Sequence, residues 1–103
     1  MTNKIYNIEE IKELLYPIFV NSPVQRAVVF GSYAQGCARE TSDIDIFVDS
    51  NGILNGFNFF GIYEKIETKL NKPVDLIEKI DLDETSPIAI EIGKGVVIYE
   101  QKR

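Results

Sequence analysis

The stretch from Gly31 to Val48 (GSYAQGCARETSDIDIFV) places residues suited to phosphate binding next to residues suited to metal binding. Its last part, 43–48 (DIDIFV), alternates acidic and apolar side chains, which predicts a strand with Asp43 and Asp45 on one face. Two residues on the same face of a strand are roughly 7 Å apart along the backbone. The two carboxylates can therefore converge on one or two cations between them.

Gly31 and Ser32 directly follow an apolar run, 27–30 (AVVF), so a buried strand is expected to end there and lead into a short helix between 32 and 39. A glycine lets backbone N–H groups approach a phosphate, and the N-terminus of a helix favours its negative charge. Ser32 adds a hydroxyl donor, and Gly36 is a candidate for a positive φ angle or a close backbone approach. We expect this turn to bind phosphate.

Asp75 stands among apolar neighbours in 74–77 (VDLI), which is predicted to be a third strand. A buried, unpaired carboxylate is costly, so such a position usually has a reason. If this strand lies beside the second, Asp75 joins Asp43 and Asp45, and three adjacent carboxylates repel unless divalent cations neutralise them. Oxygen ligands favour Mg²⁺ or Mn²⁺. Two such ions, about 4 Å apart, can hold the attacking and leaving oxygens of a nucleotidyl transfer, with Asp75 placed to accept a proton.

The composition makes several other kinds of protein improbable. A chain of 103 residues, 45% of them hydrophobic, predicts one domain with one core. It contains no histidine, which excludes Ser-His-Asp and Cys-His catalysis and most zinc sites. Its net charge of -5 is unfavourable for holding a nucleic-acid backbone. The lone Cys37 and an N-terminus without a hydrophobic signal core lead us to expect a cytoplasmic protein.

The rest of the pattern predicts an α/β fold, a small mixed sheet flanked by helices. Asn7 and Glu10 form a candidate capping box for a first amphipathic helix, which Pro17 is expected to end or kink. A second helix is predicted to end near Asn71. Four aromatic residues at helical spacing are expected to be core rather than a shelf for a nucleobase: Phe57, Phe59, Phe60 and Tyr63.

Two segments near the end of the chain are less regular. The stretch 81–91 is ambiguous, because Pro87 can open a helical turn or merely interrupt a loop. The stretch 95–99 (GVVIY) is predicted to be a last short strand or sheet edge.

These residues resemble a known family. Gly31-Ser32, ten intervening residues and Asp43-Ile44-Asp45 are similar to the GS-x10-D-x-D signature of the DNA polymerase β-like nucleotidyltransferases, specifically their minimal, single-domain members. The stretch 72–77 (KPVDLI) resembles the strand that carries that family's third acid, and the likeness in pattern extends from about residue 8 to 99. One departure is Gln35, where many relatives have arginine.

The resemblance implies a polymerase β-like nucleotidyltransferase fold over residues 1–103 and a role for each motif residue. Asp43 and Asp45 are then expected to hold two magnesium ions, and Asp75 to complete the metal site and help activate the acceptor. Gly31 and Ser32 are expected to hold the triphosphate of ATP. Minimal members are commonly encoded beside a HEPN-domain ribonuclease toxin and act as its antitoxin by transferring AMP to a tyrosine of the toxin. The resemblance thus implies a protein adenylyltransferase with a HEPN toxin as partner. The acidic charge and the lack of an apolar run of membrane-spanning length lead us to expect no direct nucleic-acid or membrane partner.

Other interpretations stay open. The same chemistry can serve a small molecule such as an aminoglycoside, although that relative normally needs an additional helical domain. The protein can also be a non-catalytic antitoxin whose acidic surface complements a basic ribonuclease. Taken singly, the motifs have plain structural explanations: Gly31-Ser32 as an ordinary turn, Asp43 and Asp45 as the polar face of a strand, and Asp75 as a salt-bridged acid.

Overall fold

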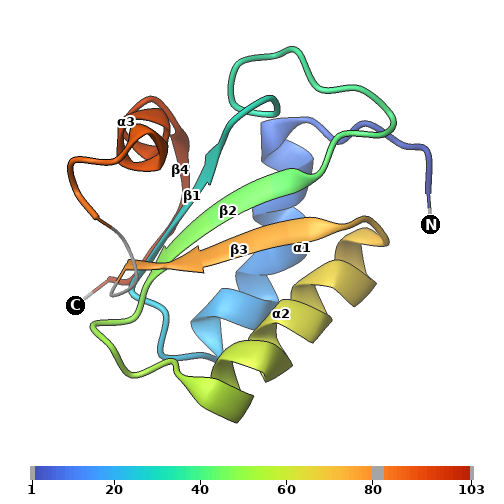
Figure 1. Ribbon diagram of the computed structural model, residues 1–103. Coiled ribbons are helices and arrows are strands. Elements are labelled where there is room, and N and C mark those ends of the chain that lie inside the picture. The colour runs from blue at the N-terminus through green and yellow to red at the C-terminus, as the bar shows by residue number, and fades with distance from the viewer. Residues whose placement is uncertain (1, 80–82, 103) are drawn as a thin grey trace.

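The computed structural model describes residues 2–79 and 83–102, which form a four-stranded sheet with helices on both faces (Figure 1). The elements in chain order are α1 (Ile8–Val20), β1 (Arg26–Phe30), β2 (Ile44–Asp49), α2 (Gly56–Leu70), β3 (Val74–Glu78), α3 (Pro87–Gly93) and β4 (Val96–Glu100).

The sheet is mixed, as the sequence predicted. Its strand order is β3-β2-β1-β4, with β1 antiparallel to both β2 and β4 and β3 parallel to β2. The parallel pair is joined through α2, because parallel strands need a long crossover connection. The last strand was expected to be a sheet edge, and β4 does lie at one edge, while β3 forms the other.

Successive strand residues point to opposite faces of the sheet, so that an apolar layer packs on each face. One face packs on α1 and α2, which lie side by side in Figure 1, with α1 behind the strands and α2 below β3. The opposite face carries a smaller cluster of Val28, Phe30 and Phe47, which packs on Ile77 of β3 and on Ile92 of α3. Since α3 covers this second face only in part, the face remains partly open to solvent at the starts of β2 and β3.

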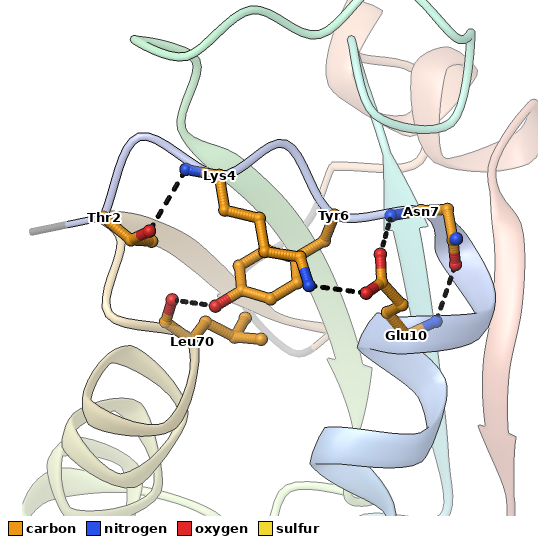
Figure 2. Close-up of polar contacts among 6 residues, drawn as sticks. All are labelled: Thr2, Lys4, Tyr6, Asn7, Glu10 and Leu70. Carbon is orange, nitrogen blue, oxygen red and sulfur yellow. Dashed lines mark hydrogen bonds and ion pairs between the residues drawn. The ribbon is translucent and has the colours of Figure 1, made fainter.

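Helix α1 begins as predicted. The side chain of Asn7 accepts a hydrogen bond from the backbone N–H of Glu10, and Glu10 accepts one from the backbone N–H of Asn7 (Figure 2). Pro17 was expected to end or kink the helix, and the first of these alternatives is wrong, because α1 continues to Val20. We attribute the extra turn to Phe19, which is completely buried in the core.

The segment before α1 is attached to the far end of α2. The hydroxyl of Tyr6 donates a hydrogen bond to the carbonyl oxygen of Leu70 at 2.6 Å, as Figure 2 shows. The backbone N–H of Thr2 donates to the carbonyl oxygen of Asn71 at 3.0 Å. These bonds satisfy carbonyl groups at a helix C-terminus, and they hold in place the turn that leads into β3.

Helix α2 ends at Leu70, followed by Asn71 in the left-handed conformation, near the predicted end. Its aromatic residues are not the core, contrary to our expectation: the exposed fractions of Phe57 and Phe60 are 95% and 54%, and Phe59 and Tyr63 are half-buried. The face that packs on the sheet is offset from them and consists of Ile62, Ile66 and Leu70. The aliphatic residues of this helix, and not its larger aromatic ones, therefore form the packed face.

The ambiguous stretch 81–91 is helical at its end. Ser86 accepts a hydrogen bond from the backbone N–H of Ala89 and caps α3, with Pro87 as the first helical residue. Residues 81 and 82 lie outside the described part of the chain. Within that part, no helix is long and apolar enough to cross a membrane.

Candidate active site

Two neighbouring strands bring the predicted acids to one region. Asp45 in β2 stands directly opposite Asp75 in β3, so both side chains project from the same face of the sheet. Asp43 lies one residue before β2. The backbone N–H of Ile44 donates a hydrogen bond to the carbonyl oxygen of Pro73 at 3.1 Å, which fixes the starts of the two strands against each other (Figure 1).

The three carboxylates differ in exposure. Asp45 is half-buried, whereas Asp43 and Asp75 are exposed. The premise that Asp75 is a buried, unpaired acid is wrong, because it lies on the open face of an edge strand. Its apolar neighbours instead reflect the alternation of β3, whose Val74 faces the helices. The position of Asp75 opposite Asp45 does not depend on that premise.

Asp45 is the residue most affected by its surroundings. Partial burial raises its pKa to about 6, with further contributions from the negative charges of Asp75 and then Asp43. Three carboxylates are therefore close enough to repel one another at neutral pH. Such an arrangement attracts cations.

The glycine of the motif turn packs against this acid. Gly31 has φ +70°, a conformation that residues with a side chain rarely adopt. A Cβ atom at this position would collide with the Oδ2 atom of Asp45. The turn expected to hold phosphates and the acid expected to hold metal are therefore in direct contact, with no room for a side chain between them.

The segment after Gly31 consists of turns, so the predicted helix between 32 and 39 is wrong. The backbone N–H of Gln35 donates to the carbonyl oxygen of Gly31 at 3.2 Å, and that of Cys37 donates to the carbonyl oxygen of Ser32 at 3.0 Å. Gly36, at φ +74°, leaves the helical conformation after this single turn. The predicted special backbone at Gly36 is thus confirmed, and it is what prevents a helix.

Sequence reasoning missed how this loop is held. Tyr33 is only 5% exposed and anchors the loop in the main core. The side-chain amide of Gln35 donates to the carboxylate of Glu91 in α3 at 3.0 Å. Tyr33 could have been suspected because it is the only aromatic residue between Phe30 and Phe47, but the Gln35–Glu91 pair spans 56 positions and leaves no local signal.

A third residue missed from the sequence is Glu67 in α2. One of its oxygens, Oε2, accepts hydrogen bonds from the Tyr63 hydroxyl at 2.7 Å and from the backbone N–H of Val74 at 3.1 Å. This contact joins the helix to the first residue of β3. The pKa of Tyr63 is raised by the bond to Glu67 and by burial, and to a smaller extent by the charges of Glu67, Asp43 and Asp75.

The acids fit a hard divalent cation by their chemistry. In the parts of the chain that the structure describes, no three His, Cys, Asp or Glu side chains are gathered closely enough to hold a metal ion. Asp43, Asp45 and Asp75 thus lie near one another without forming a closed set of ligands. All their donors are carboxylate oxygens, which suit Mg²⁺ or Mn²⁺, and a cation there would relieve the repulsion that helps to raise the pKa of Asp45.

Comparison with known proteins agrees with this geometry. The family model described as "Polymerase beta, Nucleotidyltransferase" matches residues 9–103. A putative protein adenylyltransferase of Methanocaldococcus jannaschii is 39% identical over 83 residues, which is 77% of this chain and 96% of the relative. The protein adenylyltransferase MntA of Thermococcus cleftensis is 42% identical over 74 residues, 72% of this chain and 73% of the relative.

Solved structures share the fold. A toxin-antitoxin structure with AMP-PNP superposes with a TM-score of 0.71 at 24% identity, covering 94% of this chain and 76% of that one. A complex of tri-AMPylated Shewanella oneidensis HEPN toxin with MNT antitoxin gives 0.62 at 22% identity, covering 92% and 71%. These similarities confirm the expected fold and the resemblance seen in the motifs. The chain belongs to the polymerase beta nucleotidyltransferase family.

Proposed function

We propose that this protein is an Mg²⁺-dependent adenylyltransferase that transfers AMP from ATP to a tyrosine hydroxyl of a HEPN-type ribonuclease toxin, and thereby acts as its antitoxin. The observation that carries the proposal is the contact between Gly31 and Asp45, together with the pairing of Asp45 and Asp75. A triphosphate held at the Gly31-Ser32 turn has its phosphorus atoms next to the carboxylates.

The comparisons support the acceptor and the partner. Relatives from two archaea are named protein adenylyltransferases, so their acceptor is a protein. Structural neighbours include a complex with AMP-PNP and one in which the HEPN toxin is tri-AMPylated. We extend ATP as substrate and a HEPN toxin as partner from those proteins to this one. We further propose that residues 1–103 act as one minimal nucleotidyltransferase domain in the cytoplasm.

The proposed reaction assigns a task to each motif residue. Gly31 and Ser32 orient the triphosphate through backbone N–H groups and the serine hydroxyl. Asp43, Asp45 and Asp75 would hold Mg²⁺, which supplies positive charge for the phosphates and for the leaving pyrophosphate. The tyrosine oxygen of the partner attacks the α-phosphorus, the bond from that phosphorus to the bridging oxygen of the β-phosphate breaks, and pyrophosphate leaves. Asp75, which is exposed, accepts the tyrosine proton.

The direct test is transfer of label. The purified protein is incubated with its HEPN partner, ATP labelled at the α-phosphorus and Mg²⁺, and the modified residue is identified by mass spectrometry. We expect label on a partner tyrosine, lost in the double variant Asp43→Asn/Asp45→Asn. Asp49→Asn is the matched control, because Asp49 lies on the same strand at the opposite end and pairs with Lys79.

The same experiment separates the alternatives. Inhibition of the toxin without label, unchanged in the double variant, would contradict the enzymatic proposal and favour a non-catalytic antitoxin that acts by contact. Label found on a small hydroxylated molecule but never on the partner would contradict the choice of acceptor alone.

A further inference from the structure

Lys72 is a lysine in an unusual environment. It lies between α2 and β3 and is 1% exposed, whereas Lys65 and Lys69 on the neighbouring helix are exposed. A buried ammonium group loses its hydration, which costs free energy unless hydrogen bonds replace the lost water. The contacts of Lys72 therefore indicate what its burial achieves.

The buried ammonium holds the turn that precedes Asp43. Its Nζ atom donates a hydrogen bond to the backbone carbonyl oxygen of Glu40 at 2.9 Å. Among residues 2–79 and 83–102, no carboxylate lies within ion-pair distance of it. Glu40 belongs to a turn that two hydrogen bonds between Arg39 and Ser42 close. The Ser42 N–H donates to the Arg39 carbonyl oxygen, and the Arg39 N–H donates to the Ser42 hydroxyl. The next residue is Asp43.

The other side of Lys72 leads to Asp75, three positions further on. The carbonyl oxygen of Pro73 accepts the hydrogen bond from Ile44 that aligns the starts of β2 and β3. Before Lys72, the carbonyl oxygen of Leu70 is held by the Tyr6 hydroxyl (Figure 2). The turn that contains Lys72 is thus held by the N-terminal segment. Through Lys72, the same turn holds the segment that carries Asp43.

We propose that Lys72 is a positioning residue of the active site: its buried ammonium fixes the turn that carries Asp43 against the strand that carries Asp75, so that both carboxylates can bind the same cation. The inference rests on the proposed function. Lys72 is too buried to touch a nucleotide or a partner, so it acts through Asp43. Residues that orient metal ligands typically change metal affinity or activity about 10- to 100-fold when removed.

Three variants of the whole chain test this role. Lys72→Met keeps the length of the apolar stem and removes the donor, Lys72→Arg keeps a donor, and Lys69→Met removes the same charge from an exposed position. Binding of Mn²⁺ is measured by electron paramagnetic resonance, and folding is checked by circular dichroism. We expect Lys72→Met to bind Mn²⁺ at least about 10-fold more weakly, Lys72→Arg to recover part of the loss, and Lys69→Met to match the unchanged protein.

A folded Lys72→Met chain that binds Mn²⁺ as tightly as the unchanged protein would overturn the inference. If Lys72→Met fails to fold, Ser42→Ala is used instead, because it removes the hydroxyl that closes the same turn. Unchanged Mn²⁺ binding by folded Ser42→Ala would overturn the inference as well. Failure of the proposed function looks different. An unchanged protein that binds Mn²⁺ in a Lys72-dependent manner but labels no partner contradicts the adenylyltransferase proposal and leaves the positioning role intact.

Discussion

Gly31 and Gly36 show how differently two glycines in one loop can be constrained. Both have positive φ angles, +70° and +74°. A Cβ atom on Gly31 would collide with the Asp45 carboxylate, whereas one on Gly36 has no atom within 4 Å. A residue with a side chain would be strained at both positions, but only at Gly31 would the side chain also displace an acid.

Alanine substitutions at these two positions should separate strain from site geometry. Gly36→Ala should cost about 1–2 kcal/mol of unfolding free energy through left-handed strain alone, with adenylyl transfer largely retained. Gly31→Ala carries the same strain and also displaces Asp45, so we expect loss of transfer by roughly 100-fold or more, the effect of about an ångström of misplacement. Thermal unfolding and label transfer are measured on both. Equal activities of the two variants would contradict a special role for the contact at Gly31.

The raised pKa of Asp45 makes the stability of the metal-free protein depend on pH. Its pKa is about 6 in the folded chain against 3.8 as the ordinary value, so between these values the folded chain keeps a proton that the unfolded chain has lost. Stability should therefore fall as pH rises through this window, and the cost is fully present above about pH 6.

Asp45→Asn removes that cost. Because the carboxyl is partly solvated, we expect a gain on the order of 1 kcal/mol near neutral pH and little change near pH 3, where Asp45 is mostly protonated in both states. Denaturant unfolding at the two pH values measures it. Asp49→Asn, which removes an acid paired with Lys79, should show no such gain. A large loss of stability for Asp45→Asn would instead make Asp45 a structural residue.

The acids of the candidate site could be identified from the sequence, but the residues that support them could not. Alternation along 43–48 predicted a strand that carries Asp45, and the condition that the strand of Asp75 lies beside it is met, with Asp43 one residue before β2. Lysine is seldom buried, so nothing in the local pattern pointed to Lys72. Its burial results from segments 32 positions apart that meet only in the folded chain.

At the level of elements, the strands were predictable from the alternation along 43–48 and from short apolar runs such as 27–30 and 95–99. Helix α2 was found, but the expectation that its aromatic residues form the core was wrong, because Phe57 and Phe60 lie at exposed positions. The predicted helix after Gly31 failed because its hydrogen bonds close a single turn before Gly36 reverses the backbone. The positive φ angle of Gly36 was expected from the sequence, but its effect of ending the turn before a helix can form was not.

The link between α2 and β3 is a second support that can be tested. Glu67→Ala removes the acceptor for the Val74 N–H and the Tyr63 hydroxyl, leaving a partly buried donor without a partner. We expect a loss of about 1–3 kcal/mol of stability, visible in thermal unfolding, and reduced transfer because β3 carries Asp75. Glu64→Ala, an exposed position one turn earlier, should change neither. Similar melting temperatures for the two variants would show that the link is not stabilising.

At the scale of the whole molecule, the open face of the sheet determines how a partner can approach. Asp43 and Asp75 are exposed at the starts of two strands, and on the same face α3 packs against the cluster of Val28, Phe30 and Phe47. An acceptor hydroxyl can therefore reach the carboxylates without any opening of the fold. A net charge of -5 makes it unfavourable to hold a triphosphate at such a face unless divalent cations are bound with it.

Nucleotide and metal should consequently stabilise the fold only in combination. A ligand that binds only the folded chain adds about 2.7 kcal/mol at 100 times its dissociation constant, so AMP-PNP with Mg²⁺ should raise the melting temperature measurably, while AMP-PNP with a chelator should not. The shift should disappear in Asp43→Asn/Asp45→Asn and persist in Asp49→Asn, whose acid is paired with Lys79. It should also shrink near pH 5, because Asp45, with its pKa of about 6, must then lose a proton before it can bind the cation. A shift that does not depend on Mg²⁺ or on these acids would place the nucleotide elsewhere on the molecule, away from the Gly31 turn.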